Sequence, residues 1–318
     1  MKKAMLIWNP AAGRVGAERD VREAARALTG WEVHFEPSQS AAHVTELAQT
    51  AARENWEAVF VAGGDGSLGR AVAGLAGSAT ALGVLPTGTT NVWAQELGLP
   101  IVGRQRLVES ARQLAAGHVQ TMDIGLCNGL PYLLWAGFGL DARVIDRLER
   151  KRSRWMKRLN EIYYLLTIFQ CARGWPGAQV QVTADGQTVE GRFILALAGN
   201  IRLYAGGLLS PNARWNDGKQ ELWLLGSGKN GGVPSVIRHL WNLGRGQHVQ
   251  DRNTLCLPFR QLKLTFATPE WMHLDGEPYG TVQEAEIQIW AQGLRVLVPT
   301  EKTSHPPTSN EQHASTPE

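Results

Sequence analysis

The sequence predicts a protein in two parts: an α/β part with a mostly parallel sheet, then a β-rich part that forms an antiparallel β-sandwich. Three observations support this. Strand-like and helix-like segments alternate up to Thr121, and short strands separated by turn residues dominate from Met122 onward. The length of 318 residues also exceeds that of most single domains. We therefore expect one domain over residues 1–121, a second over 122–292, and a disordered tail over 301–318.

The first part consists of βαβ units. Residues 58–62 (AVFVA) are an apolar run typical of a buried strand, and the Ala- and Arg-rich residues 17–28 are typical of a helix. Repeated strand–helix alternation indicates parallel strands in one sheet. The expected strands are 5–8, 31–35, 58–62 and 81–85, and the expected helices are 17–28, 43–54, one from the 63–67 loop to 75, one beginning at 91, and 105–116.

The second part has strand-like runs divided by turns such as Asp185-Gly186 and Asn216-Asp217-Gly218, which favours a sandwich or barrel. One long helical segment, residues 142–172, interrupts the strands. The expected strands are 130–136, 178–184, 191–198, 221–225, 261–266, 286–290 and 295–298.

Composition narrows the class of protein. A formal net charge of only +3 argues against a nucleic-acid binder. The three cysteines are isolated, which is typical of reduced thiols in a cytoplasmic protein. The apolar start, Met5–Trp8, is too short for a secretory signal, and no apolar run is long enough to span a membrane. The tail from Glu301 is rich in Ser, Thr and Pro and is expected to be disordered.

Two loops carry the chemistry. Gly63-Gly64-Asp65-Gly66-Ser67 lies between a buried strand and a helix, where backbone N–H groups and the helix dipole favour a phosphate. Asp65 would repel phosphate unless it acts through Mg²⁺ or accepts a proton from an attacking hydroxyl. A plain turn with an N-cap is the alternative. Pro86-Thr87-Gly88-Thr89-Thr90-Asn91 follows the next strand, so both loops should open on one edge of the sheet.

Further motifs follow in a fixed order along the chain. From about Leu6 to Pro299 they make the chain resemble the diacylglycerol kinase catalytic-domain family, which includes soluble bacterial lipid kinases and sphingosine kinases. The motifs that carry the resemblance are Asn9-Pro10 to Gly13, Gly63–Ser67, Pro86–Asn91, Asp123-Ile124-Gly125, Gly137–Ala142, Gly206-Gly207 with Pro211, Asn216–Gly218 and Asp275-Gly276-Glu277.

The resemblance implies an ATP- and Mg²⁺-dependent lipid kinase with its active site between the two parts, and a return of residues 293–300 to the first part. It implies catalytic roles for Asp65, Asp275 and Glu277, with the base among them left open. It implies metal roles for Asp65, Asp123 and Asp217, although Asn216-Asp217-Gly218 is also a good turn. The residues it assigns to the nucleotide are Asn9, Gly63, Gly64, Gly66, Ser67, Thr87, Gly88, Thr89 and Asn91.

The chain departs from the family pattern at three positions. Gly69 and Arg70 replace an Asn-Glu pair, and Val92 stands where many members have an aspartate. Val92 removes one carboxylate from the expected metal network, which makes diacylglycerol uncertain as the acceptor and leaves other lipid alcohols open. His273 beside the Asp275 motif is interpreted as an ordinary structural histidine.

Lipid at a membrane surface is the expected partner, with the protein cytoplasmic and peripheral to the membrane. The basic segment Arg147–Arg158 is either a solvated helix face or a site that docks on anionic headgroups. A dimer is compatible with the sequence. Two rival functions stay open: a kinase for a soluble acceptor, like NAD kinases, and a non-catalytic nucleotide-binding regulator.

Overall fold

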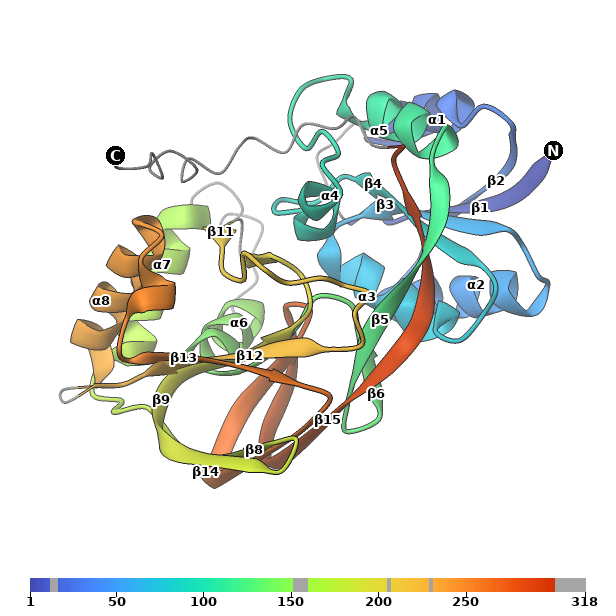
Figure 1. Cartoon of the computed structure of the whole chain (residues 1–318). Helices are drawn as coiled ribbons and strands as arrows, with labels where there is room; N and C mark the ends of the chain where they lie inside the picture. The colour runs from blue at the N-terminus through green and yellow to red at the C-terminus, as the bar shows by residue number, and fades with distance from the viewer. Residues whose placement is uncertain (12–16, 151–159, 205–206, 229–230, 301–318) are drawn as a thin grey trace, which may run out of the picture.

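A computed structural model describes residues 1–11, 17–150, 160–204, 207–228 and 231–300 (Figure 1). Four sequence expectations lie wholly or partly outside these residues. They concern Gly13, Gly206, the basic residues 151–158 and the tail 301–318. Within the described part of the chain, no helix is long and apolar enough to cross a membrane.

The first half is built on four neighbouring strands in the order β2-β1-β3-β4. β1 pairs in parallel with β2 and β3, and β3 pairs in parallel with β4. Helices α1 and α5 cover one face of this sheet and α2 and α3 cover the other, as Figure 1 shows. β3 and β4 are buried at every residue, which explains their continuous apolar sequence. The bounds are β1 (Lys2–Trp8), β2 (Trp31–Pro37), β3 (Ala58–Gly63), β4 (Ala81–Pro86), α1 (Ala17–Ala27), α2 (Ala41–Arg53), α3 (Asp65–Leu75), α4 (Val92–Glu96) and α5 (Arg106–Ala115).

The second half is β-rich, as expected, but four of its strands close on themselves. β7 pairs with β9 and β14, and β8 pairs with the same two strands, all antiparallel. Of the sandwich or barrel expected for this part, these four strands form a closed, barrel-like ring. The ring closes because β9 and β14 are long and each pairs with both β7 and β8 along its length. The bounds are β6 (Leu130–Tyr132), β7 (Trp135–Gly139), β8 (Ala178–Ala184), β9 (Gln187–Gly199), β10 (Leu203–Tyr204), β11 (Gly207–Leu208), β12 (Gln220–Gly226), β13 (Thr254–Phe259) and β14 (Gln261–Leu274).

A register shift allows β14 to pair with both β8 and β7 in the ring. Residues 262–266 pair with β8, and residues 272–274 pair with β7. Between these stretches the pairing of β14 with its other neighbour, β15, shifts from Thr265 to Glu270. Such an irregularity bends a strand and lets it turn from one partner to the next. Nothing in the alternation of apolar and polar residues predicted this bend.

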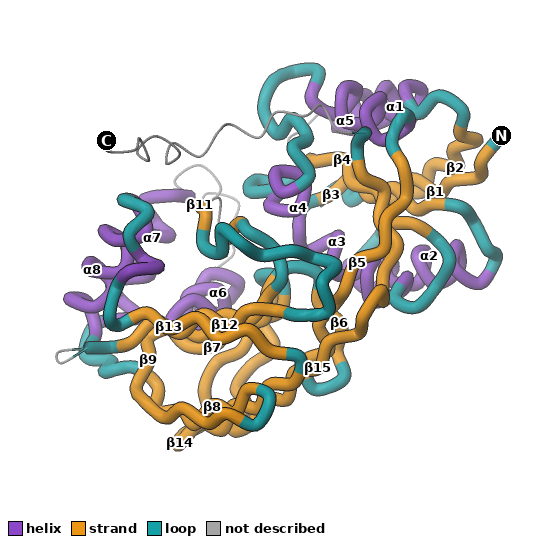
Figure 2. The backbone as a smooth tube through the Cα atoms, in the orientation of Figure 1, coloured by secondary structure: helices purple, strands orange, loops and turns teal. Residues whose placement is uncertain are grey.

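Two long strands run through both halves. β5 (His118–Cys127) and β15 (Glu277–Val298) pair with each other over most of their length, and Figure 2 shows them side by side between the halves. β15 begins beside β14 and ends beside β4, where Arg295 and Val296 pair in parallel with Ala81 and Leu82. The expected boundaries at residues 121 and 292 both fall inside these strands.

The expectation of separate strands at 286–290 and 295–298 was wrong, because β15 is continuous through both. Its register shifts between Trp290 and Leu294, where Gln292 has a positive φ of 53°. Apolar pattern is interrupted at such a bulge, so the sequence suggested two strands where there is one.

Helices α6, α7 and α8 gather beside the β-rich half (Figure 1). α6 and α7 contact each other, α7 contacts α8, and α6 packs on β14. The sequence predicted one long helical segment here and did not predict α8. A small apolar cluster that includes Leu140, Val144 and Val236 joins them to β9. The bounds are α6 (Leu140–Arg150), α7 (Asn160–Ala172) and α8 (Gly232–Gly244), with a short 3₁₀ helix at His248–Gln250.

Candidate active site

A cavity of about 270 Å³ opens where the two glycine loops of the first half face the second half. Both parts of the chain contribute to its wall, so the cavity exists only in the folded two-part molecule. From the first half it is lined by Gly64, Asp65, Gly66, Thr89, Thr90 and Val92, and from the second by Leu134, Trp135, Ile145, Tyr164, Tyr204, His273, Asp275 and Gly276.

The two glycine loops touch each other. A Cβ placed on Gly88 would lie 2.6 Å from the Cα of Gly64, so neither loop could approach the other with a side chain there. The N–H of Thr87 donates to the carbonyl of Gly63 at 3.1 Å. Asn91 holds its own loop closed, because its amide both accepts from and donates to the backbone of Gly88 at 2.9 Å. The glycines therefore allow the two loops to pack against each other, in addition to the close approach of a phosphate that the sequence predicted.

The first loop of the chain joins this pair. The side-chain amide of Asn9 donates to the hydroxyl of Ser67 at 2.9 Å, and the N–H of Asn9 donates to the carbonyl of Ala62. The structure thus brings together Asn9, the Gly63–Ser67 loop and the Thr87–Asn91 loop, as predicted for a common site. Helix α3 begins at Asp65, directly after Gly64, whose carbonyl accepts from the N–H groups of Ser67 and Leu68 at 3.0 and 3.1 Å. A phosphate is the natural ligand for such a helix start beside glycine loops.

Asp65 lies in the wall of the cavity and is held by the start of helix α4. One of its carboxylate oxygens accepts from the N–H of Val92 at 2.9 Å, and the other accepts from the N–H of Trp93 at 3.2 Å. Burial raises the pKa of Asp65, and these two hydrogen bonds oppose that rise. Each oxygen keeps acceptor capacity toward the cavity. Asp65 can therefore take a proton there.

Asp275 is the second buried carboxylate of the cavity. It accepts from the N–H groups of Leu133 and Leu134 at 2.7 Å and of Trp135 at 3.0 Å. Burial, together with the nearby charge of Asp65, raises the pKa of Asp275 to about 6 against these bonds. Two carboxylates in one cavity repel each other, so one of them holds its proton more readily than an ordinary aspartate.

The departures at residues 69 and 70 have a structural explanation. A Cβ on Gly69 would lie 3.0 Å from a carboxylate oxygen of Asp275, so glycine allows this side chain to approach helix α3. Arg70 lies 3.5 Å from the carboxylate of Glu277. Glu277 packs over Gly66, where a Cβ would lie 2.5 Å from its carboxylate oxygen. Glu277 thus lies next to the phosphate loop but is not part of the cavity wall.

A cluster that the sequence analysis did not assign forms the opposite wall. Asp141 accepts from the hydroxyl of Tyr204 and from His273, each at 2.6 Å. The N–H of Gly276 donates to Nδ1 of His273 at 3.2 Å, which assigns the ring proton to Nε2. Burial and the Asp141 carboxylate hold the pKa of Tyr204 well above its usual value, so its hydroxyl keeps its proton.

The interpretation of His273 as a merely structural residue was incomplete, because His273 is buried and lines the cavity. Asp141 stood in a quoted motif, Gly137–Ala142, but no role was assigned to it. Gly137 explains part of that motif, since a Cβ there would overlap the ring of His273. The sequence signal for this cluster was the motif that places Gly137 shortly before Asp141. Only the fold brings Asp141 next to His273 and Tyr204.

The predicted metal ligands do not form a direct metal-binding group. Within the described residues, no set of three or more His, Cys, Asp or Glu side chains surrounds a common point. Asp123 instead accepts from the N–H groups of Gly218 at 2.7 Å and Gln292 at 2.8 Å, and Asp217 accepts from the N–H of Lys219. Asp123 therefore ties β5 to the 216–218 turn and to β15. The metal roles of Asp65, Asp123 and Asp217 stay predictions.

Two protein-family models match this chain. The diacylglycerol kinase catalytic domain matches residues 3–127, and the YegS C-terminal NAD kinase beta sandwich-like domain matches residues 135–298. The second match alone covers just over half of the 318 residues.

Whole proteins and a solved structure are also similar to this chain over nearly its full length. A diacylglycerol kinase of Bacillus subtilis (strain 168) is 28% identical over 308 residues, which is 95% of this chain and 98% of that protein. A diacylglycerol kinase of Staphylococcus carnosus (strain TM300) is 25% identical over 304 residues, covering 94% and 95% of the two chains. The crystal structure of a diacylglycerol kinase from Bacillus anthracis str. Sterne shares the fold, with a TM-score of 0.69 at 18% identity over 93% of this chain and 97% of that one.

Proposed function

Because this chain belongs to the diacylglycerol kinase catalytic-domain family, we propose that it is a kinase that transfers the γ-phosphoryl group of ATP to a hydroxyl group of a lipid. The observation that carries the proposal is the composition of the cavity. Glycine loops at a helix start, the carboxylates of Asp65 and Asp275 and an aromatic wall meet in one space of about 270 Å³. Phosphoryl transfer needs these parts, because it consists mainly of positioning and charge stabilisation.

The residues of the first half would hold ATP. The loops Gly63–Ser67 and Thr87–Asn91 are braced against each other, and the N-terminal end of helix α3, which favours an anion, begins beside them. ATP supplies the phosphoryl group and a good leaving group. A divalent ion is usual in kinases and would be carried by the nucleotide phosphates, with Asp65 and Asp123 as its predicted partners through water.

Asp65 would accept the proton of the attacking hydroxyl. It lines the cavity at the start of helix α3 and has free acceptor capacity. The raised pKa of Asp65 improves it as a base, since a carboxylate with a higher pKa accepts a proton more readily. Asp275 would act beside it by fixing residues 133–135 in the wall.

The second half would hold the lipid acceptor. Ile145, Tyr164 and Trp135 offer apolar surface next to the polar group formed by Tyr204 and His273. Such a wall suits a molecule with a hydroxyl at one end and an apolar body behind it. The acceptor would then lie between this wall and the phosphate loops, with its hydroxyl toward Asp65.

A transfer assay with labelled ATP and a panel of lipid alcohols tests the proposal. The panel should contain a diacylglycerol, a phosphatidylglycerol, a sphingoid base and an isoprenoid alcohol, each in mixed micelles, with NAD as the soluble comparison. We expect a labelled lipid product with at least one member and none with NAD. Label on NAD alone would assign the soluble-acceptor function, and ATP binding without transfer to any acceptor would assign a non-catalytic regulator.

The acceptor is drawn from a membrane, and we propose that the protein docks there peripherally through the basic segment Arg147–Arg158. Of this segment the structure describes Arg147 and Arg150 at the end of helix α6. Helix α7, which follows in the chain, exposes Leu165 and Leu166. Cations beside exposed apolar side chains are the combination that favours an anionic membrane surface. Cytoplasmic placement of the protein is part of the same proposal.

A further inference from the structure

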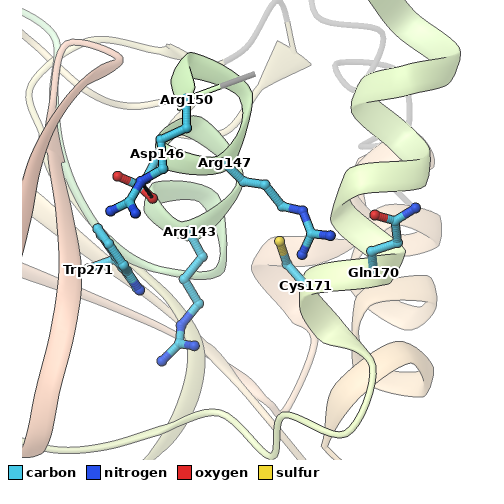
Figure 3. A pocket seen from close by; sticks show the side chains of 7 residues that line it. All are labelled: Arg143, Asp146, Arg147, Arg150, Gln170, Cys171 and Trp271. Atoms are coloured by element: carbon cyan, nitrogen blue, oxygen red, sulfur yellow. Dashed lines mark ion pairs between the residues drawn. The ribbon is translucent and has the colours of Figure 1, made fainter. Parts of the chain in front are cut away.

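A second cavity of about 400 Å³ lies on helix α6, on the face turned away from the candidate active site. Ile145 of this helix lines the active site. The α6 residues that line the second cavity lie three, four and seven positions after Arg143 and share the opposite face of the helix with it. Figure 3 shows them together with side chains from helix α7 and strand β14. They are Arg143, Asp146, Arg147, Arg150, Gln170, Cys171 and Trp271.

Two of the three arginines are fixed in place. Arg143 makes two hydrogen bonds to the buried carboxylate of Glu270, at 2.7 and 2.8 Å, and its guanidinium lies 4.5 Å from the ring centre of Trp175. Arg150 pairs with Asp146 at 2.8 Å and lies over the ring of Trp271. These contacts neutralise both cations and hold their guanidinium planes at the edge of the cavity.

Arg147 is different. It makes no hydrogen bond, ion pair or ring contact with any residue in the described part of the chain. Figure 3 shows its half-buried side chain extending toward Cys171 and Gln170 of helix α7. Within the described ranges of the chain, three guanidinium groups therefore share the cavity region with two carboxylates, Asp146 and Glu270, and one positive charge has no partner among these residues.

The helix dipole explains only part of this arrangement of arginines. Basic residues in the last turn of a helix offset the helix dipole, and Arg147 and Arg150 are in the last turn of α6. That effect acts on arginines exposed to solvent and does not require a cavity, an aromatic wall or a third arginine on the same face. A bound anion accounts for all of these features together.

We propose that this cavity binds a phosphoryl group, either that of an anionic phospholipid headgroup or that of free phosphate. Arg147 would donate two parallel hydrogen bonds to the phosphoryl oxygens, because a guanidinium matches their geometry. The side-chain amide of Gln170 offers a further donor, and Trp271 gives an apolar wall for the group attached to the phosphate. The volume lies in the range of sites that hold small ligands.

This site is separate from the proposed transfer reaction. None of its lining residues lines the active-site cavity, although both cavities use helix α6 and strand β14. Trp271 in one wall and His273 in the other are two residues apart on β14. A phosphoryl group bound here would lie about one helix diameter, roughly 10 Å, from the acceptor site.

Calorimetric titration of the full chain tests the site with two probes, inorganic phosphate and monomeric dihexanoyl phosphatidic acid. A non-hydrolysable ATP analogue in excess keeps the glycine loops occupied. Arg147→Gln removes the unpartnered cation, and Gln170→Glu adds a carboxylate opposite it without removing a guanidinium. Arg252→Gln is the matched control, since it changes the net charge equally at an exposed position of the same half.

We expect binding to the wild type, a loss of about tenfold or more in both cavity variants, and no change in Arg252→Gln. Equal losses for both probes assign the site to the phosphoryl group itself, and a loss for the lipid alone assigns it to headgroups. The proposal is overturned if neither probe binds the wild type, or if Arg147→Gln and Gln170→Glu bind both as tightly as Arg252→Gln. Because Arg147 has no partner to lose, its replacement should leave the melting temperature unchanged.

Discussion

At the scale of single residues, the candidate site depends on carboxylates that are buried but not isolated. Asp65 and Asp275 together accept five backbone N–H bonds, from residues 92, 93 and 133–135. Such bonds hold a carboxylate in one orientation and oppose the rise in pKa that burial causes. Both pKa values are nevertheless raised, so burial outweighs the hydrogen bonds at this site.

Replacing Asp65 by Asn should lower the rate of transfer at least about 100-fold, because an amide cannot accept the proton of the attacking hydroxyl. The fold should survive, since the amide oxygen can keep one of the two backbone bonds and the loss of the other costs about 1–3 kcal/mol. Turnover with a lipid acceptor and nucleotide affinity should be measured on the same preparation. Turnover near that of the wild type would remove Asp65 from the chemistry.

Asp275 should make stability depend on pH in an unusual direction. The pKa of Asp275 in the folded protein is about 6, above the value of 3.8 for a free side chain, so the folded state binds the proton more tightly. Its contribution to stability is therefore complete below about pH 4 and is lost as pH rises through 6. The full difference of about two pKa units corresponds to roughly 3 kcal/mol.

Urea denaturation of wild type and Asp275→Asn between pH 4 and 7 measures this effect. The variant lacks the titration, so the stability of the wild type relative to the variant should fall as pH rises across this range. The comparison cancels the other carboxylates, which the two proteins share. A difference that stays constant or grows with pH would mean that Asp275 does not titrate as described.

At the scale of elements, the site depends on how closely the glycine loops approach each other. Gly88→Ala should weaken nucleotide binding at least about tenfold, because its Cβ would lie 2.6 Å from the Cα of Gly64 and backbone atoms must move. Gly244→Ala is the control, since no atom lies within 4 Å of a Cβ there and the position is helical. Nucleotide affinity by calorimetry decides the outcome, and equal affinities for the two variants would contradict the role given to the loops.

At the scale of the whole molecule, one buried ion pair helps to bring the wall of the second half to the first. Arg202 pairs at 2.8 Å with Glu96 of helix α4, whose side chain is only 3% exposed. Tyr204, which lines the cavity, is two residues beyond Arg202. This ion pair therefore positions part of the acceptor wall against an element that also carries the bonds to Asp65.

Arg202→Met should lower the free energy of unfolding by about 3 kcal/mol, because it leaves the buried carboxylate of Glu96 without a cation. It should raise KM for the lipid acceptor and leave nucleotide affinity little changed. Arg112→Met breaks an exposed pair with Glu109 instead, and should cost less than about 1 kcal/mol. The two denaturation midpoints are the measurement. Equal effects would show that the Arg202–Glu96 pair is no more than a surface contact.

Membrane docking should depend on the basic residues that follow helix α6. Replacing Lys151, Arg152 and Arg154 by Gln should reduce sedimentation with anionic vesicles. The free energy of vesicle binding should weaken by up to roughly 3 kcal/mol at low salt, and this effect should shrink as the salt concentration rises. Activity on a water-soluble, short-chain acceptor should stay close to that of the wild type. Unchanged vesicle binding with lost activity on that acceptor would assign these residues to structure or chemistry.

The sequence alone determined the features that depend on neighbours in the chain. The apolar strand at 58–62, the glycine loops after two successive strands and the order of α/β before β-rich segments are all local patterns. They predicted which loops would meet, because parallel strands end at one edge of a sheet. The contact between Gly63–Ser67 and Thr87–Asn91 is the structural result of that rule.

Only the tertiary structure decided the features that depend on residues far apart. His273, Asp141 and Tyr204 are separated by more than 60 residues from one another, and no local pattern predicts that they share hydrogen bonds. The barrel-like closure and the continuity of β15 depend on bulges, which interrupt the alternation that marks a strand. That Arg147 has no partner among the residues the structure describes is likewise visible only in the fold, which pairs Arg143 with Glu270 and Arg150 with Asp146, since pairing depends on positions in space and not on order in the sequence.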